Sequence, residues 1–362
     1  MEGDMTQIRR WLMPLSWFYG LGVDVRNALF DMGVLPSVSY EIPIINVGNI
    51  TVGGTGKTPH VEYLIRLLAQ RYRVAVLSRG YKRKTKGYIL STTASTMEEI
   101  GDEPWQIKQK FPDVYVAVDA NRRRGIERLM TDEATKDVEV ILLDDAYQHR
   151  YVKAGHNILL VDYHRIISDD RLLPAGRLRE RPSASSRAST VIVTKCPQHI
   201  NAMGFRVILS SLNIRPYQQL FFSTFTYETM RQLWGNGTLE PEELRKDNTH
   251  VLLLTGIGNP RQMEQDVRKF VQHLSSLAFP DHHYYSRRDA DAINTALQEL
   301  PKPHIIITTE KDAARLQHLD GLTDEVKEHT FVLPIEISIM RNEKDKFDKT
   351  INDYVRENKR NS

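Results

Sequence analysis

One stretch near the N-terminus decides the fold: IINVGNITVGGTGKTPHVEYLIRLL, residues 44–68. It begins with the β-branched run of a buried strand, passes through a glycine-rich loop and ends in apolar residues at helical spacing. Strand, loop and helix in this order are the context that a phosphate-binding P-loop requires. Glycines let backbone N–H groups turn toward phosphate oxygens, and the helix N-terminus adds its dipole. The stretch therefore predicts a nucleotide-binding α/β domain, the alternative being a glycine-rich turn with a chance Gly-Lys-Thr.

The loop itself predicts the residues that bind nucleotide. Lys57 would reach the β- and γ-phosphates as a catalytic cation, and the hydroxyl of Thr58 would bind Mg²⁺. The first glycine of the usual motif is replaced by Thr51. The predicted nucleotide-binding residues are Thr51, Val52, Gly53, Gly54, Thr55, Gly56, Lys57 and Thr58.

A second acidic element follows a later apolar run, ILLDD at residues 141–145. A carboxylate at the C-terminal end of a parallel strand faces the ligand crevice of an open α/β sheet. Asp144 or Asp145 is therefore expected to hold Mg²⁺, directly or through water. An acidic pair after a strand is often only a helix cap, but the upstream loop favours the metal.

The remaining pattern predicts two α/β domains. Near-continuous apolar strands separated by helices indicate a parallel sheet covered on both faces, and a second, smaller set of such runs follows. Two further runs, 220–227 and 330–339, predict a two-stranded β-ribbon that joins the domains. The strand runs are 42–47, 74–77, 114–118, 140–143, 158–161 and 191–194 in the first domain, and 251–254 and 304–308 in the second. We expect an N-terminal segment (1–38), a P-loop domain (39–218, with 341–362 packing back on it) and a ribbon with the smaller domain (219–340).

The N-terminal segment has the character of a membrane-surface helix. Arg9 and Arg10 precede Trp11, Trp17 and further aromatic residues, a combination that suits lipid headgroups. The apolar run is too short to span a bilayer, which takes about 20 residues, and no signal-peptide cleavage site follows it. The alternative is a helix whose apolar stripe packs on its own domain.

Composition disfavours a nucleic-acid-binding function and a disulfide-bonded or zinc-binding protein. Lys and Arg total 49 against 46 acidic residues, a net charge of only +3, which disfavours a nucleic-acid partner. The single cysteine, Cys196, can form neither an internal disulfide nor a zinc site, so a reducing compartment is expected.

Eight motifs follow one another along the chain: VGNITVGGTGKTPH (47–60), LSRGYKRK (77–84), GDEP (101–104), LLDDAYQHR (142–150), LLPAGRLRE (172–180), TGIGNP (255–260), FPDHHYY (279–285) and TEKDAARL (309–316). In this order the motifs resemble those of the tetraacyldisaccharide 4′-kinase family of lipid A synthesis. The family also accommodates threonine at the start of the P-loop. Where it commonly has Gly-Phe in its DDGFQH element, this chain has Ala146-Tyr147.

The resemblance implies a reaction and a location. The expected reaction is transfer of the γ-phosphate of ATP, with Mg²⁺, to the 4′-hydroxyl of a tetraacylated glucosamine disaccharide 1-phosphate, giving lipid IVA. The expected location is the cytoplasmic face of the bacterial inner membrane, as a peripheral or monotopic protein. The partners implied are the lipid-linked substrate and the membrane surface, with no obligate protein partner evident.

The resemblance also assigns an acid–base pair. Asp102 in GDEP would orient the acceptor hydroxyl and take its proton; the residues alone favour an N-cap for a helix from Glu103. His282 is the expected partner of Asp102, although the adjacent His283 is an alternative. Glu180 is a further candidate for the metal region. Expected ligands of the substrate phosphate or the transferred group are Arg79, Arg122, Arg177 and Arg179, while the run of arginines at 122–124 is also consistent with a solvated face.

Two other classes of protein remain as alternatives. A membrane-associated switch ATPase of the deviant Walker A type would carry its signature lysine where this chain has Val52. A metallochaperone GTPase would need clustered metal ligands near the loop, which the sequence lacks. Thr194-Lys195 ends a late strand where guanine-reading GTPases carry Lys-x-Asp, but Pro197 replaces the aspartate.

Overall fold

The computed structural model describes residues 8–246, 248–257, 260–280 and 283–359. The chain forms two compact units, one of Met1–Phe225 with Ile337–Ser362 and the other of Thr226–Glu336. It passes between them twice, within strand β8 (Gln219–Tyr227) and within strand β15 (Ile335–Ile339). The two strands are neighbours at one edge of the larger sheet.

The first unit contains a nine-stranded sheet in the order β15-β8-β7-β6-β1-β5-β2-β4-β3. Neighbours from β8 to β4 pair in parallel, and β3 is antiparallel to β4 at the far edge. The predicted parallel α/β fold is confirmed. The strands are β1 (Ile44–Gly48), β2 (Val74–Ser78), β3 (Ile89–Leu90), β4 (Tyr115–Val118), β5 (Val140–Asp144), β6 (His156–Asp162) and β7 (Thr190–Thr194), with β8 and β15.

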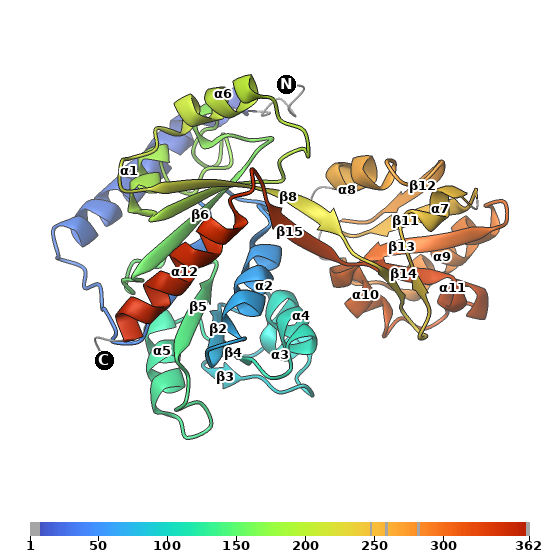
Figure 1. Cartoon of the computed structure of the whole chain (residues 1–362), viewed down its shortest axis with the longest axis horizontal. Coiled ribbons are helices and arrows are strands. Elements are labelled where there is room, and N and C mark those ends of the chain that lie inside the picture. Colours follow the sequence, from blue (N-terminus) through green and yellow to red (C-terminus); the bar gives the residue numbers. More distant parts are fainter. Residues whose placement is uncertain (1–7, 247, 258–259, 281–282, 360–362) are drawn as a thin grey trace. The chain divides into compact units, whose positions relative to one another are not determined.

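The helices of this unit cover the sheet and bury apolar side chains on it. The C-terminal helix lies beside α2 in Figure 1; Phe347, Ile351 and Val355 join the same core cluster as Ile45 and Leu64. Every residue of β1, β2, β5 and β7 is buried, as expected for strands covered on both faces. The helices are α1 (Met13–Asp31), α2 (Lys57–Leu68), α3 (Met97–Ile100), α4 (Asp102–Lys110), α5 (Arg122–Thr131), α6 (Ala202–Leu212) and α12 (Lys344–Lys359), with 3₁₀ turns at Arg10–Leu12, Ile167–Asp169 and Pro182–Arg187.

The second unit is a smaller α/β structure with a six-stranded sheet in the order β10-β9-β14-β13-β11-β12. Strands β12, β11, β13 and β14 are parallel, and β9 runs antiparallel to β14. Its elements are β9 (Met230–Gln232), β10 (Thr238–Leu239), α7 (Glu243–Lys246), β11 (His250–Thr255), α8 (Pro260–Val267), β12 (His273–Ala278), α9 (Arg287–Gln298), β13 (His304–Thr309), α10 (Glu310–Leu316), α11 (Asp324–Glu328) and β14 (Thr330–Leu333).

The run 330–339, read in the sequence as one ribbon strand, is divided in the structure. It breaks at Pro334 into β14, which belongs to the six-stranded sheet, and β15, which belongs to the nine-stranded sheet. Proline has no backbone N–H to donate to a ladder and is therefore found where a strand ends. The apolar pattern on both sides of the proline had concealed this change of sheet.

Helix α1 is amphipathic but turns its polar side to the protein. Arg181 pairs with Asp24 at 2.7 Å, and Asn27 donates to Glu180 at 3.0 Å. At Gly20 the helix approaches the domain so closely that an added Cβ would lie 2.7 Å from Leu172. The large apolar side chains left exposed on or beside the helix are Trp11, Met13, Leu15, Trp17, Phe18, Tyr19, Leu21, Val25, Met32 and Val34.

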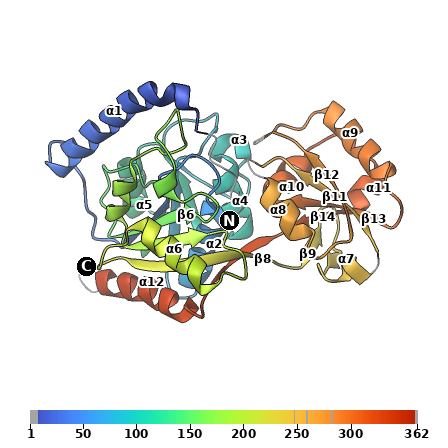
Figure 2. The ribbon, with the colours of Figure 1, turned by 90° about the horizontal axis from the view of Figure 1, so that it is seen from above.

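This orientation rules out the alternative in which the apolar stripe of α1 packs on its own domain. The helix lies along the outside of the first unit in Figure 2. Among the described residues, no helix is long and apolar enough to cross a membrane.

Candidate nucleotide-binding and phosphotransfer site

The glycine-rich loop leaves β1 and enters α2 at Lys57. Gly53 and Gly56 have φ of +117° and +80°, the left-handed region that glycine enters without a steric penalty. The side-chain amide of Asn49 donates to the hydroxyls of Thr51 at 3.3 Å and Thr55 at 2.9 Å. Through these two hydrogen bonds the Asn49 side chain connects the start of the loop, at Thr51, with its later part, at Thr55.

A short segment from the LLPAGRLRE motif runs beside the start of the loop. The N–H of Val52 donates to the carbonyl of Arg177 at 2.7 Å, and the N–H of Arg179 donates to the carbonyl of Ile50 at 2.7 Å. The two stretches form an antiparallel bridge. This pairing holds Arg177 and Arg179 next to the loop, with the Arg177 side chain exposed.

The aspartates at the end of β5 lie next to the loop because β5 pairs with β1, with Val47 opposite Asp144. Asp144 is buried, and its carboxylate accepts a hydrogen bond from the Ser78 hydroxyl at 3.1 Å. Asp145 lies 3.6 Å from the Lys57 ammonium and 3.2 Å from the Arg179 guanidinium. The structure therefore brings Lys57, Arg179 and the acidic pair together.

The pKa values of the two carboxyl groups are shifted in opposite directions. Burial, and then the negative charge of Asp145, raise the pKa of Asp144 to about 6. Burial also favours the neutral form of Asp145, but Lys57 and Arg179 outweigh it and hold the pKa of Asp145 below its ordinary value. Adjacent carboxyl groups in a buried place are stabilised by a cation, so this charge pattern fits a divalent metal.

The donor set fits Mg²⁺ in kind. Thr58 is buried in the first turn of α2 and offers a hydroxyl, and Asp144 and Asp145 offer carboxylate oxygens. Magnesium prefers oxygen ligands and commonly takes few from the protein, the rest coming from phosphate and water. Within the described part of the chain, no three His, Cys, Asp or Glu side chains are grouped to hold an ion by themselves.

A buried arginine contacts the backbone of the acidic pair. The Arg122 guanidinium is buried and donates to the backbone carbonyls of Asp119 at 2.7 Å and Asp144 at 3.2 Å. Burial lowers the pKa of Arg122 to about 10. Burial, followed by the charges of Arg122, Arg26 and Arg79, lowers the pKa of His149 to about 4. The positive charges of these three arginines thus act on a neutral histidine, and Arg79 is exposed.

Asp102 is the first residue of α4, and the N-cap is Gly101, so the N-cap interpretation of Asp102 is wrong by one position. A capping side chain must lie outside the helix to reach the N–H groups of its first turn. The neighbouring Glu103 contributes to the raised pKa of Asp144. The start of α4 is therefore close to the acidic pair.

His282 lies outside the described residues, and so does the adjacent Asp281. The alternative, His283, is engaged locally: Nε2 lies 3.0 Å from the Asp289 carboxylate, and the ring stacks on Phe279 with centroids 5.0 Å apart. The contacts of His283 are those of a residue that fixes the N-terminus of α9.

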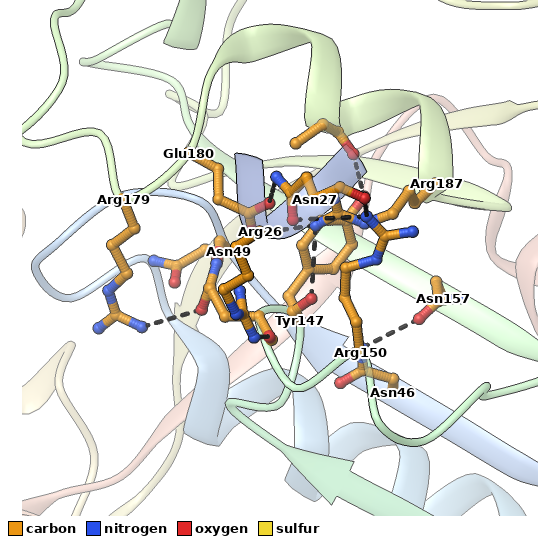
Figure 3. Close-up of polar contacts among 12 residues, drawn as sticks. Arg26, Asn27, Asn46, Asn49, Tyr147, Arg150, Asn157, Arg179, Glu180 and Arg187 are labelled. Atoms are coloured by element: carbon orange, nitrogen blue, oxygen red, sulfur yellow. Dashed lines mark hydrogen bonds and ion pairs between the residues drawn. The ribbon is translucent and has the colours of Figure 1, made fainter. Parts of the chain in front are cut away.

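Glu180 is buried and makes contacts that hold α1 in place. One carboxylate oxygen accepts from Asn27 at 3.0 Å, and the other accepts from Arg187 at 2.9 Å (Figure 3). Arg187 also lies over the Tyr147 ring, 4.8 Å from its centroid. These partners occupy both oxygens, which favours a structural role over the metal role expected from the sequence.

Three side chains near the loop were not identified from the sequence as functional. His149 and His60 lie inside quoted motifs but show no spacing that marks them. The His60 ring is buried and contacts the carbonyl of Gly56 at 2.7 Å, and burial lowers its pKa to about 4. Gln148 donates to the carbonyl of Asn49 at 2.8 Å and so connects the acidic element to the loop.

Comparison with known proteins gives one consistent result. Residues 8–356 match the model of the family described as tetraacyldisaccharide-1-P 4′-kinase. The chain is 51% identical to the tetraacyldisaccharide 4′-kinase of Phocaeicola vulgatus, covering 100% of this chain and 99% of that protein. Identity to the Porphyromonas gingivalis enzyme of the same name is 46%, over 93% and 94% of the two chains.

A solved structure supports the same assignment. LpxK from Aquifex aeolicus, crystallised in an "apo" form in complex with ATP, superposes with a TM-score of 0.74 at 29% identity. The match covers 96% of this chain and 99% of that one.

Proposed function

The chain belongs to the tetraacyldisaccharide-1-phosphate 4′-kinase family, and from this membership we propose that it transfers the γ-phosphoryl group of ATP to the 4′-hydroxyl of its disaccharide substrate, giving lipid IVA. The observation that carries the proposal is the P-loop with Lys57 set 3.6 Å from Asp145 at the ends of two paired strands. Phosphoryl transfer needs positioning and neutralisation of charge, and this arrangement supplies both.

Lys57 and the loop act on the nucleotide. The Lys57 ammonium lies 3.6 Å from Asp145, and its charge would neutralise that of the β- and γ-phosphates. Backbone N–H groups of residues 51–58 surround the phosphates. Thr58, Asp144 and Asp145 are the residues that would hold Mg²⁺, and the ion would withdraw charge from the phosphate oxygens.

Asp102 acts as the general base. It accepts the proton of the 4′-hydroxyl as the oxygen attacks phosphorus, and the position of α4 beside the acidic pair supports this role. His282 is its partner and keeps the carboxyl in the charged form. His283 is a weaker candidate because Asp289 and Phe279 already engage its ring.

The arginines bind the phosphate groups. Arg179 contacts Asp145, and this nearness to the acidic pair supports a role in binding the transferred group. Arg122 and Arg79, whose charges both act on His149, form a cationic region suited to the 1-phosphate of the acceptor. Arg177 projects from the segment that pairs with the loop and is a further phosphate contact.

The N-terminal helix places the enzyme at the membrane surface, where its lipid substrate lies. Trp11, Trp17 and Phe18 are 77%, 68% and 64% exposed, and Arg9 and Arg10 beside them are exposed as well. Aromatic and basic side chains together favour the headgroup layer of an anionic membrane. The corresponding location is the cytoplasmic face of the inner membrane, where ATP is available.

The test is transfer of label from γ-labelled ATP to a tetraacylated disaccharide 1-phosphate in mixed micelles. Label that appears in the lipid fraction, and is absent when the acceptor lacks a free 4′-hydroxyl, supports the proposal. Label released only as inorganic phosphate would contradict it and point to a switch ATPase.

A further inference from the structure

Two side chains at the end of strand β7 donate hydrogen bonds to backbone carbonyls of the glycine-rich loop. The Thr194 hydroxyl donates to the carbonyl of Thr55 at 3.0 Å. The Lys195 ammonium donates to the carbonyl of Gly54. Thr194 is completely buried and Lys195 nearly so. Thr194 and Lys195 occupy the position at which guanine-reading enzymes carry their base-specificity motif, and in this chain they contact the loop instead.

The next carbonyl along the loop is held by a third side chain. His60 Nδ1 lies 2.7 Å from the carbonyl of Gly56, and Nε2 lies 2.9 Å from the Ser223 hydroxyl. A carbonyl oxygen can only accept, so Nδ1 carries the proton, and Nε2 of the neutral ring accepts from Ser223. The ring therefore connects the loop to β8.

Holding these carbonyls has a geometric consequence. In a trans peptide, the carbonyl and the N–H of the following residue point in opposite directions. When the carbonyls of residues 54, 55 and 56 point back into the protein, the N–H groups of residues 55, 56 and 57 point the other way. That direction is the one needed to bind phosphate oxygens.

We propose that His60, Thr194 and Lys195, which we call the carbonyl clamp, are positioning residues that hold the loop in its phosphate-binding conformation before nucleotide arrives. The inference rests on the proposed function, since it concerns the same nucleotide site. None of the three side chains needs to touch the nucleotide, because each acts through a loop carbonyl.

The clamp is itself fixed by the sheet. Lys195 also pairs with Asp162, 2.6 Å away at the end of β6. The backbone carbonyl of Ser223, the residue that holds His60, accepts the N–H of Cys196 at 2.9 Å. Pre-organisation of this kind lowers the cost of ordering the loop on binding, so its loss weakens affinity for ATP.

The test is Thr194→Val, which removes the hydroxyl and keeps the shape. We expect the Kd for ATP, measured by titration calorimetry with Mg²⁺, to rise about threefold to tenfold, the usual worth of one hydrogen bond. The KM for the lipid acceptor should stay unchanged, because the clamp acts only on the loop. Thr194→Ser keeps the hydroxyl and should restore affinity toward the wild-type value.

A matched control and a second variant separate positioning from stability. Thr308 in β13 is also completely buried and also donates to a carbonyl, that of Leu254 at 3.0 Å; Thr308→Val should lower the melting temperature without changing the Kd for ATP. His60→Ala should weaken ATP binding more than His60→Asn, which keeps a donor near the position of Nδ1.

Two results would contradict the proposed role of the carbonyl clamp. One is wild-type affinity in both Thr194→Val and His60→Ala, and the other is an equal loss of affinity in Thr308→Val. A wild-type chain that does not bind ATP at all would overturn the proposed function along with the clamp.

Discussion

Removing two exposed aromatic side chains from α1 should detach the protein from membranes without unfolding it. Trp17 and Phe18 are 68% and 64% exposed, and their rings contact each other with centroids 5.7 Å apart. Complete burial of such a side chain is worth about 1.5–3 kcal/mol. With about two thirds of each still exposed, insertion gains about 1–2 kcal/mol per ring, or about 2–4 kcal/mol for both.

The double variant Trp17→Ser/Phe18→Ser should therefore bind vesicles about thirtyfold to several hundredfold more weakly, at tenfold per 1.4 kcal/mol. Sedimentation with vesicles of anionic phospholipid, titrated in lipid, measures the change. Tyr284→Ser is the control, because Tyr284 is 69% exposed but belongs to the second unit. Unchanged vesicle binding in the double variant, or an equal loss in Tyr284→Ser, would refute the membrane role of α1.

Three further predictions concern the Asp102–His282 pair, Glu180 and Asp162. Asp102→Ala and His282→Ala should each lower kcat about 10²–10⁴-fold. If the two residues act as a unit, the kcat of the double variant should be little lower than that of the poorer single variant. Multiplicative losses of kcat in steady-state assays would mean that the two residues act independently. Glu180→Gln should lower the free energy of unfolding by about 1–3 kcal/mol, because Arg187 loses a charged partner. The same variant should leave the Mg²⁺ dependence of activity unchanged. A raised requirement for Mg²⁺ would instead indicate that Glu180 belongs to the metal site. Burial favours the neutral form of Asp162, but its bonds with His164 and Lys195 outweigh burial and lower its pKa to about 2. The stabilisation from its charge is therefore present above the unfolded-state pKa of about 4 and is lost as pH falls toward 2. Denaturant titrations should show Asp162→Asn less stable than wild type at pH 7, with a difference that narrows between pH 4 and 2; a constant difference would contradict this pairing.

Much of the first unit was predictable because its signals are local. The strands are short β-branched runs, and the loop and the acidic pair are marked by residue type and spacing at strand ends. The direction in which α1 faces was not predictable, because an amphipathic pattern shows two faces without saying which one the protein covers. The change of sheet at Pro334 was hidden by apolar residues on both sides.

The clamp and the role of Glu180 depend on contacts that are distant in sequence. Thr194 reaches a loop residue 139 positions away, and Glu180 reaches Asn27 over 153 positions. No local spacing encodes such a contact. A single buried histidine such as His60 likewise gives no periodic signal, since its importance comes from the two groups that it joins.

We propose that Lys57 acts on the phosphate transferred from ATP to the lipid. The most direct measurement is kcat for label transfer from γ-labelled ATP to the tetraacyldisaccharide 1-phosphate by Lys57→Ala, with circular dichroism to confirm the fold. In the proposed role the Lys57 charge stabilises the transferring phosphate, so we predict a loss of about 10²-fold or more with an intact fold. Transfer at close to the wild-type rate in a folded Lys57→Ala protein would show that Lys57 does not act on the transferred phosphate.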